Sequence, residues 1–224
     1  MKEILKVLVG SHAHGLATEE SDIDYRGVFV VPTVDLLKIG HGAPKHNSWT
    51  EGDKEDDTSY EVAHFLHLAT KSNPSILEVF TAPMITMEPE GKRLRDLFPY
   101  VWSSKRVVDA FTGYSKNQRK KMLDDKYPFR DRKWKFAVAY LRTLIQGIGL
   151  LRTGELCVKI PDKEIDFLRD IKSGKCSIGQ IMDYAEMYQT TLYTVYDDSP
   201  KQEVNWGPIN DFLLDIRQSH WGKE

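Results

Sequence analysis

Four residues near the start of the chain have the types and spacing to bind a phosphate and a metal ion: Gly10, Ser11, Asp22 and Asp24. The strand expected over 4–9 breaks at Gly10, and a glycine followed by a serine can offer backbone N–H groups and a hydroxyl to a phosphate. Asp22 and Asp24 are two residues apart in a second expected strand, so they share one face of a sheet. Their mutual repulsion must be offset, and a divalent cation would do so. The pattern therefore predicts a phosphate site beside a metal site.

An isolated Asp-x-Asp pair at a strand end is more often a solvated or turn-forming pair than a metal site. Here a glycine break follows one expected strand and the aspartates occupy another. The glycine break suits a phosphate and the aspartates suit a cation, and this combination favours the metal site. A chain that keeps such a fold without catalysis is the remaining alternative, because a fold alone does not establish a reaction.

The chain resembles the DNA polymerase beta-like nucleotidyltransferase superfamily in the spacing of Gly10-Ser11, Gly15, Ser21-Asp22-x-Asp24 and Gly27. Within it, the form GSHAHGLATEESDIDYRGVFV is most similar to a bacterial and phage family of predicted nucleotidyltransferases linked to RNA repair. The resemblance covers about residues 4–155. Its further matches are Tyr60, Glu61, Phe65, Asn73, Pro74, Glu78, Tyr114, Gln118, Lys135 and Arg142.

The resemblance implies a metal-dependent enzyme that moves a nucleoside monophosphate from an NTP to a hydroxyl acceptor. It implies that Asp22, Asp24 and a third carboxylate on a neighbouring strand are catalytic and hold Mg²⁺ or Mn²⁺. Asp56 and Asp57 are the candidates for the third position, and we assign it to Asp57, with Asp56 as the alternate, because Asp57 lies nearest the start of the expected helix at the strand end. At least one of them is expected to stabilise the start of that helix through its dipole instead.

The nucleotide is expected to contact Gly10, Ser11 and Ser21. Lys135 and Arg142 are seven residues apart, which places them on one face of a helix after two turns. There they are candidates to neutralise the charge of the triphosphate. Arg142 could equally pair with a surface carboxylate.

An RNA end is the first choice of acceptor, from the resemblance and from a basic segment at 115–135. Residues 1–85 carry seven Lys and Arg against thirteen Asp and Glu, whereas residues 86–224 carry 24 against 20. A solvated helix face is the alternative interpretation of the basic segment. Alternative functions are protein nucleotidylation, as in the minimal nucleotidyltransferases of toxin–antitoxin pairs, and a non-catalytic sensor of nucleotide or RNA. The segment holds Lys116, Arg119, Lys120, Lys121, Lys126, Arg130, Arg132, Lys133 and Lys135, with Tyr127, Phe129 and Trp134 able to stack on a base.

The expected fold class is α+β: a small mixed nucleotidyltransferase-type sheet with flanking helices, followed by a helical C-terminal region. Residues 1–85 would form the catalytic domain, and residues 86–224 a helical domain that completes the substrate cleft. With 224 residues, of which 41% are hydrophobic, the chain is long enough for both. Strands are expected at 4–9 and 22–31, with a short edge strand within 40–57, and helices at 75–81, 88–97, 104–124, 133–152, 162–171, 178–196 and 208–220.

One further expected helix bears on the third carboxylate. Thr58 and Glu61 have the form of a capping box, which predicts a helix over 59–72. Asp56 and Asp57 would then lie directly before that helix. Its buried stripe would be Val62, Phe65, Leu66 and Ala69.

Composition disfavours several classes of protein. Cys157 and Cys176 fit no metal-ligand spacing and no disulfide framework, which indicates a reducing cytoplasm. The sequence has no apolar run of membrane-spanning length, and its first residues enter a strand rather than a signal peptide. The histidines within 12–46 lack the spacing of a zinc site, and we expect them to line the phosphate pocket. A cytoplasmic protein with an NTP as substrate is therefore expected.

Overall fold

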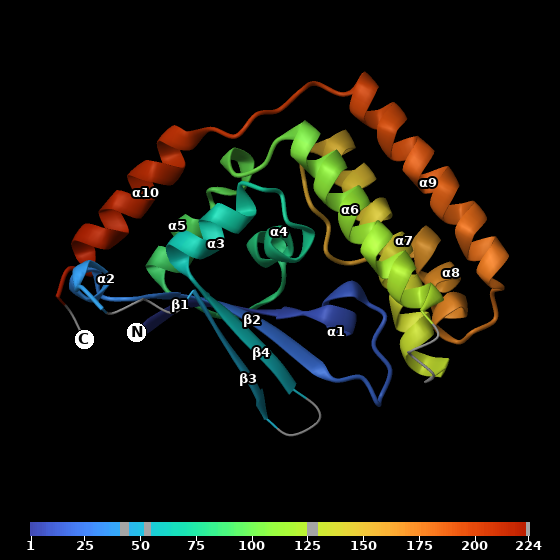
Figure 1. Ribbon diagram of the computed structural model, residues 1–224, viewed down its shortest axis with the longest axis horizontal. Helices are drawn as coiled ribbons and strands as arrows, with labels where there is room; N and C mark the ends of the chain where they lie inside the picture. The colour runs from blue at the N-terminus through green and yellow to red at the C-terminus, as the bar shows by residue number, and fades with distance from the viewer. Residues whose placement is uncertain (41–44, 52–54, 125–129, 223–224) are drawn as a thin grey trace. The chain divides into compact units, whose positions relative to one another are not determined.

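The computed structural model describes residues 1–40, 45–51, 55–124 and 130–222. The chain divides into two compact units (Figure 1). Unit 1 comprises Met1–Lys71, Ser75–Trp102 and Glu203–Glu224, and unit 2 comprises Ser72–Pro74 and Ser103–Gln202. Among the described helices, none is both long enough and apolar enough to cross a membrane.

The described strands of unit 1 form one sheet with the order β3-β4-β2-β1-β5. β2 and β4 run parallel and every other neighbouring pair is antiparallel, so the sheet is mixed. The predicted α+β class with a small mixed sheet is confirmed. β5 is absent from the predicted strands because four residues carry too little periodicity to identify a strand. The strands are β1 Lys2–Val9, β2 Ile23–Val30, β3 His46–Glu51, β4 Glu55–Glu61 and β5 Met84–Met87.

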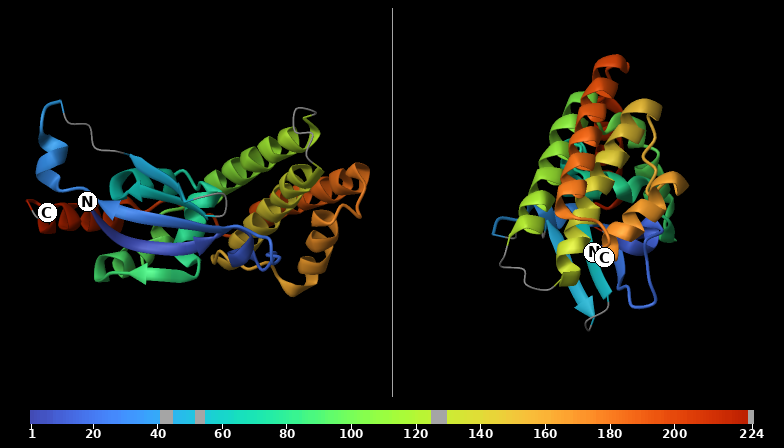
Figure 2. Two further views of the ribbon diagram at one scale, coloured as in Figure 1. Left: turned by 90° about the horizontal axis from the view of Figure 1, so that it is seen from below. Right: turned by 90° about the vertical axis from the view of Figure 1, so that its right-hand side faces the viewer.

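Helices cover the sheet within unit 1 and make up unit 2. α3 contacts β2 and β4 while α5 contacts β1, and both helices lie over one face of the sheet (Figures 1 and 2). The helices predicted after residue 74 are confirmed to within a few residues at their ends. The helices are α1 Gly10–His14, α2 Thr33–Leu37, α3 Val62–Ala69, α4 Pro74–Thr81, α5 Pro89–Arg95, the 3-10 turn Phe98–Tyr100, α6 Ser104–Leu123, α7 Arg130–Thr153, α8 Asp162–Lys172, α9 Ile178–Asp198 and α10 Trp206–Ser219.

The core of unit 1 lies between the sheet and these helices. Val7 and Val28 are completely buried on one face of the sheet, and Phe65 of α3 is completely buried as well. Burying such apolar side chains is the main favourable contribution to folding. The buried stripe predicted for α3 is confirmed: Val62, Phe65, Leu66 and Ala69.

The predicted start of α3 is wrong. β4 continues through Glu61, and α3 begins at Val62, where the Glu61 carboxylate accepts a hydrogen bond from the backbone N–H of Ala63 at 2.8 Å. Pairing of β4 with strands on both sides outweighs the local capping pattern at Thr58. Asp57 therefore lies inside a strand and not at the start of a helix.

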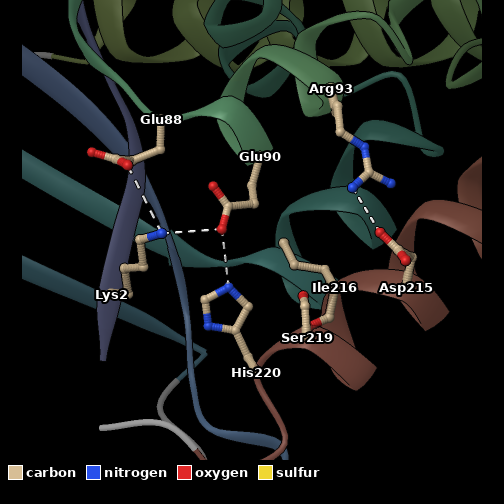
Figure 3. A network of polar contacts seen from close by, with 8 residues as sticks. All are labelled: Lys2, Glu88, Glu90, Arg93, Asp215, Ile216, Ser219 and His220. Atoms are coloured by element: carbon tan, nitrogen blue, oxygen red, sulfur yellow. Dashed lines mark hydrogen bonds and ion pairs between the residues drawn. The ribbon is translucent and has the colours of Figure 1, made fainter.

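The observed units differ from the predicted division at residue 85. β5 completes an edge of the sheet, α5 follows it on β1, and α10 returns to unit 1 from the far end of the chain. Arg217 of α10 donates from Nη2 to Glu61 Oε1 at 2.6 Å, and the two side chains are 15% and 6% exposed. His220 Nε2 at the end of α10 lies 3.4 Å from Glu90 Oε1 (Figure 3). The helical unit is thus confined to the middle of the chain.

Replacing Arg217 with Met should destabilise unit 1 by about 3 kcal/mol, because it leaves the buried Glu61 carboxylate without its cation. Urea-induced unfolding of the full chain measures this. The matched control is Arg93→Met, which breaks an ion pair with Asp215 at 2.6 Å whose side chains are both about half exposed (Figure 3). That change should cost about 1 kcal/mol or less. Equal effects of the two substitutions would contradict the anchoring role of Arg217.

Candidate functional site

The antiparallel ladder of β1 and β2 places an aspartate against the end of β1. Val9, the last residue of β1, pairs with Asp24, and Gly10 follows at once. Gly10 has a φ of +67°, and a Cβ built on it would collide with Asp24 Oδ2 and lie 2.9 Å from Asp24 Cγ. Glycine is therefore required here twice, for its backbone conformation and for the close approach of the carboxylate.

The two aspartates of the motif lie at the entrance of β2. Asp22 is exposed directly before the strand, and Asp24 is partly buried within it. Asp24 pairs with Val9, so these two side chains share one face of the sheet, whereas Asp22 lies just outside the ladder. The structure thus places the Asp24 carboxylate against Gly10, with Ser11 next to Gly10 in the chain and Asp22 directly before β2.

Ser21 shapes the loop that leads into the aspartates. Its hydroxyl accepts a hydrogen bond from the backbone N–H of Thr18 at 2.8 Å, and its own N–H donates to the Thr18 carbonyl at 3.0 Å. These are the bonds of a serine that closes a turn. The hydroxyl predicted to contact the nucleotide is thus also a structural part of the turn.

The two histidines of α1 each lie close to a polar partner within unit 1. His14 is buried, and its Nε2 lies 3.2 Å from Oε1 of the buried Glu78 on α4. His12 Nε2 lies 3.3 Å from the carbonyl oxygen of Ser21. His14 therefore ties the short α1 to α4 instead of facing solvent, a contact between residues 64 positions apart that sequence spacing cannot reveal. His41 lies outside the described residues.

The parallel ladder of β2 and β4 separates the two candidates for the third carboxylate. Asp56 pairs with Asp24, whereas Asp57 pairs with Tyr25. Paired residues share a face and alternate residues face opposite sides, so Asp57 and Asp24 lie on opposite faces of the sheet. The structure does not bring Asp57 together with Asp22 and Asp24.

Asp57 has a partner of its own. Lys6 of β1 donates a hydrogen bond from Nζ to Asp57 Oδ2, and the same ammonium lies 4.8 Å from the centroid of the Tyr25 ring. Lys6 pairs in register with Gly27, and a Cβ on Gly27 would collide with the Ser59 hydroxyl oxygen. Burial disfavours the charge on Lys6, but the hydrogen bond and negative charge of Asp57 outweigh it and raise the pKa of Lys6. The pair therefore joins three strands.

Arg26 follows Asp24 on the same face of β2. Its Nη1 donates to the hydroxyl oxygen of Tyr60 at 3.4 Å, and its Nε is buried with no hydrogen-bond partner. No ion pair joins it to a carboxylate among the described residues. The sequence places Arg26 on the face of the aspartates, but no motif signal assigns it a role.

Lys135 and Arg142 both lie on α7 in unit 2. Lys135 is exposed. Arg142 is partly buried and donates from Nη1 to Gln146 Oε1 at 2.7 Å, one turn along the same helix. Gln146 in turn donates to the carbonyl oxygen of Val158 at 3.3 Å. The partner of Arg142 in this contact is thus a buried amide and not a surface carboxylate.

The donor chemistry at the start of β2 fits a divalent cation. Among the described residues, no group of three His, Cys, Asp or Glu side chains is placed to hold a metal ion. Asp22 and Asp24 supply carboxylate oxygens, the ligands that Mg²⁺ and Mn²⁺ prefer. Asp56, whose side chain lies outside the described ones, occupies the strand position paired with Asp24. Of the three carboxylates that the resemblance implies, Asp24 lies in β2 with a position for another beside it on β4, and Asp22 precedes it by two residues in the chain.

Comparisons with known proteins agree with the motif. The model of the RNA repair pathway DNA polymerase beta family matches residues 1–192. An uncharacterized 38.9 kDa protein from the nrdC-mobD intergenic region of Enterobacteria phage T4 is 27% identical over 134 residues. That match covers 54% of this chain and 39% of the relative, so the chain spans about two fifths of the relative's length.

A solved structure is similar at a greater distance. The crystal structure of a nucleotidyltransferase-like protein from Exiguobacterium sibiricum shares 8% identity at a TM-score of 0.32, over 97% of this chain and 74% of that one. A TM-score this low carries no argument about fold or function. The family model, by contrast, spans most of the sequence and confirms the resemblance to nucleotidyltransferases linked to RNA repair. The chain belongs to the RNA repair pathway DNA polymerase beta family.

Proposed function

We propose that the protein is a metal-dependent nucleotidyltransferase that moves a nucleoside monophosphate from an NTP to a hydroxyl acceptor. The observation that carries the proposal is the close approach of the Asp24 carboxylate to the Gly10 backbone. It puts a candidate cation ligand beside a turn whose backbone is bare enough for a phosphate to approach. Membership of a nucleotidyltransferase family supports a nucleotide as substrate.

In the proposed reaction the acceptor oxygen forms a bond to the α-phosphorus of the NTP, and the bond from that phosphorus to pyrophosphate breaks. The proton of the acceptor hydroxyl passes to water or to a carboxylate of the site. Bound Mg²⁺ or Mn²⁺ would lower the pKa of the acceptor hydroxyl and neutralise the leaving pyrophosphate. Gly10 and Ser11 would hold the phosphates through backbone N–H groups and the serine hydroxyl.

We propose Asp56, the alternate in the sequence analysis, as the third carboxylate in place of Asp57. The β2–β4 register supports this choice, because Asp56 pairs with Asp24 whereas Asp57 lies on the opposite face. The ion pair with Lys6 also accounts for Asp57 without a metal ion. Asp22, Asp24 and Asp56 would then hold the cation.

An RNA end is the proposed acceptor. Lys116, Arg119 and Lys120 are exposed near the end of α6, and none forms an ion pair with a carboxylate of the described residues. Unpaired cations on one helix are suited to a phosphate backbone. Of the aromatic residues predicted to stack on bases, Tyr127 and Phe129 lie outside the described part of the chain. Trp134 is partly buried, with its indole against Gly174, so it is held in place by unit 2 itself.

Asp24→Asn and Asp56→Asn should each abolish transfer, whereas Asp57→Asn should retain it, because only the first two positions lie together on β2 and β4. Transfer of label from α-labelled NTP to RNA in the presence of Mg²⁺ or Mn²⁺ measures this. The thermal stability of Asp24→Asn should hold or rise, since removing one of two neighbouring carboxylates relieves repulsion. Asp57→Asn should lower it, because Lys6 loses its partner.

Two outcomes would contradict these assignments. Full activity of Asp24→Asn would rule out the metal site at the start of β2. Loss of transfer in folded Asp57→Asn, with activity kept in Asp56→Asn, would restore Asp57 as the third ligand. Label that moves to protein in a cell lysate and not to RNA would replace the RNA acceptor by a protein one.

Replacing Lys116, Arg119 and Lys120 together by Ala should weaken binding of a short RNA and flatten its dependence on salt. The slope of log affinity against log salt should fall by up to about one unit for each phosphate that the variant no longer binds. Fluorescence anisotropy at several salt concentrations measures both quantities. The matched control replaces three cations of unit 2 that do have carboxylate partners. The RNA affinity of this control should stay near that of the wild type. If the two triple variants bind RNA with equal affinity, α6 is excluded as the RNA surface. The control residues are Lys163, Arg169 and Lys175.

A further inference from the structure

Arg26 is a charged side chain placed partly inside unit 1. It lies in the centre of the sheet, with the fully buried Val7 paired to it from β1 and Thr58 from β4. Arginine is rarely buried unless an anion accompanies it, because removing a cation from water is costly. Its surroundings should therefore supply a compensating group.

The protein supplies Arg26 with little compensation. Its one hydrogen bond, from Nη1 to the Tyr60 hydroxyl, is long at 3.4 Å and goes to a neutral acceptor. Its Nε is buried without an acceptor. Arg217 in the same unit shows the usual arrangement, since it donates to the Glu61 carboxylate at 2.6 Å and has a contact to the Val31 carbonyl at 3.4 Å. Arg26 thus has one buried donor without an acceptor and no ion pair within the described residues.

The position of Arg26 relates these donors to the candidate site. Asp24 and Arg26 are two residues apart on one face of β2, about 7 Å along the strand. Asp24 in turn touches the Gly10 turn. A flexible arginine side chain can cover such a distance, so a group bound between Gly10 and Asp24 lies within its reach.

We propose that Arg26 binds a phosphate group of the substrate at the candidate site, beside Asp24. The planar guanidinium can give two parallel hydrogen bonds to phosphate oxygens, and the buried Nε lacks one such acceptor in the free protein. Tyr60 holds the guanidinium in place without neutralising it. This inference rests on the proposed function, and it assigns a phosphate ligand that the Gly-Ser and Asp-x-Asp motif does not include.

Two sources of phosphate share this chemistry, the NTP and an RNA strand. Arg26→Met keeps an unbranched apolar stem and removes the guanidinium, and it should weaken the binding of ATP or of RNA by about tenfold or more. Calorimetry with ATP and Mg²⁺ measures the first affinity, and anisotropy with 5′-phosphorylated and 5′-hydroxyl RNA oligomers measures the second. Arg26→Lys should fall between Arg26→Met and the wild type. The control Arg93→Met removes an exposed arginine of the same unit and should leave both affinities unchanged.

Thermal unfolding separates a ligand-binding arginine from a structural one. The midpoint for Arg26→Met should hold or rise without ligand, because the substitution removes a buried donor that has no acceptor. It should also gain less than the wild type when ATP and Mg²⁺ are added. A marked fall in the midpoint together with unchanged affinities would make Arg26 a structural residue and overturn the proposal.

The remaining outcomes distinguish this inference from the proposed function. Unchanged affinity of Arg26→Met for both ATP and RNA overturns the phosphate site, even if Asp24→Asn abolishes transfer and the function stands. ATP binding that depends on Arg26 in a wild-type protein without transferase activity supports the phosphate site and removes the function. Binding of neither ligand by the wild type overturns both.

Discussion

The candidate site depends on the register of β1 against β2. Because Val9 pairs with Asp24, the chain leaves β1 at the point where the carboxylate faces it, and Gly10 turns away with a positive φ. A slip of one residue would send Asp24 to the opposite face of the sheet, since side chains alternate along a strand. The glycine is a consequence of the same register, because a larger residue would collide with that carboxylate. The pairing of β1 with β2 therefore determines both where Asp24 lies and why position 10 is a glycine.

Charged side chains on the two faces of the sheet around β2 differ in whether they form ion pairs. On one face Asp57 is joined to Lys6 across β2, the strand that lies between them. That pair links β1 to β4 and holds the register in which Asp56 pairs with Asp24. On the other face Arg26 has no carboxylate partner among the described residues. Charges that serve the fold are thus paired within the protein, while the uncompensated cation lies beside the proposed substrate site.

The local parts of the site could be predicted from the sequence, because they depend on residues close together in the chain. The strand before Gly10, the pair Asp22 and Asp24, and the buried stripe of α3 all follow from spacing alone. The choice between Asp56 and Asp57 could not be made in this way, since it depends on the pairing of β4 with a strand about thirty residues earlier. The capping pattern at Thr58 favours a helix, and long-range pairing overrides it.

The chain order of the two units explains why α10, at the end of the sequence, belongs to unit 1. Unit 2 is inserted into unit 1, and the segments that enter and leave it lie side by side: Ser104 donates its backbone N–H to the Gln202 carbonyl at 2.9 Å. Asn205 then donates to the Tyr100 carbonyl at 2.9 Å as the chain re-enters unit 1.

The match to the family ends at residue 192, within α9, and so before α10 begins. Yet Arg217 of α10 forms an ion pair with the buried carboxylate of Glu61. Glu61 is the last residue of β4 and also the N-cap of α3. Removing a charge's partner from the interior is costly. The segment beyond the match therefore belongs to the fold that positions β4, and through β4 the residue paired with Asp24.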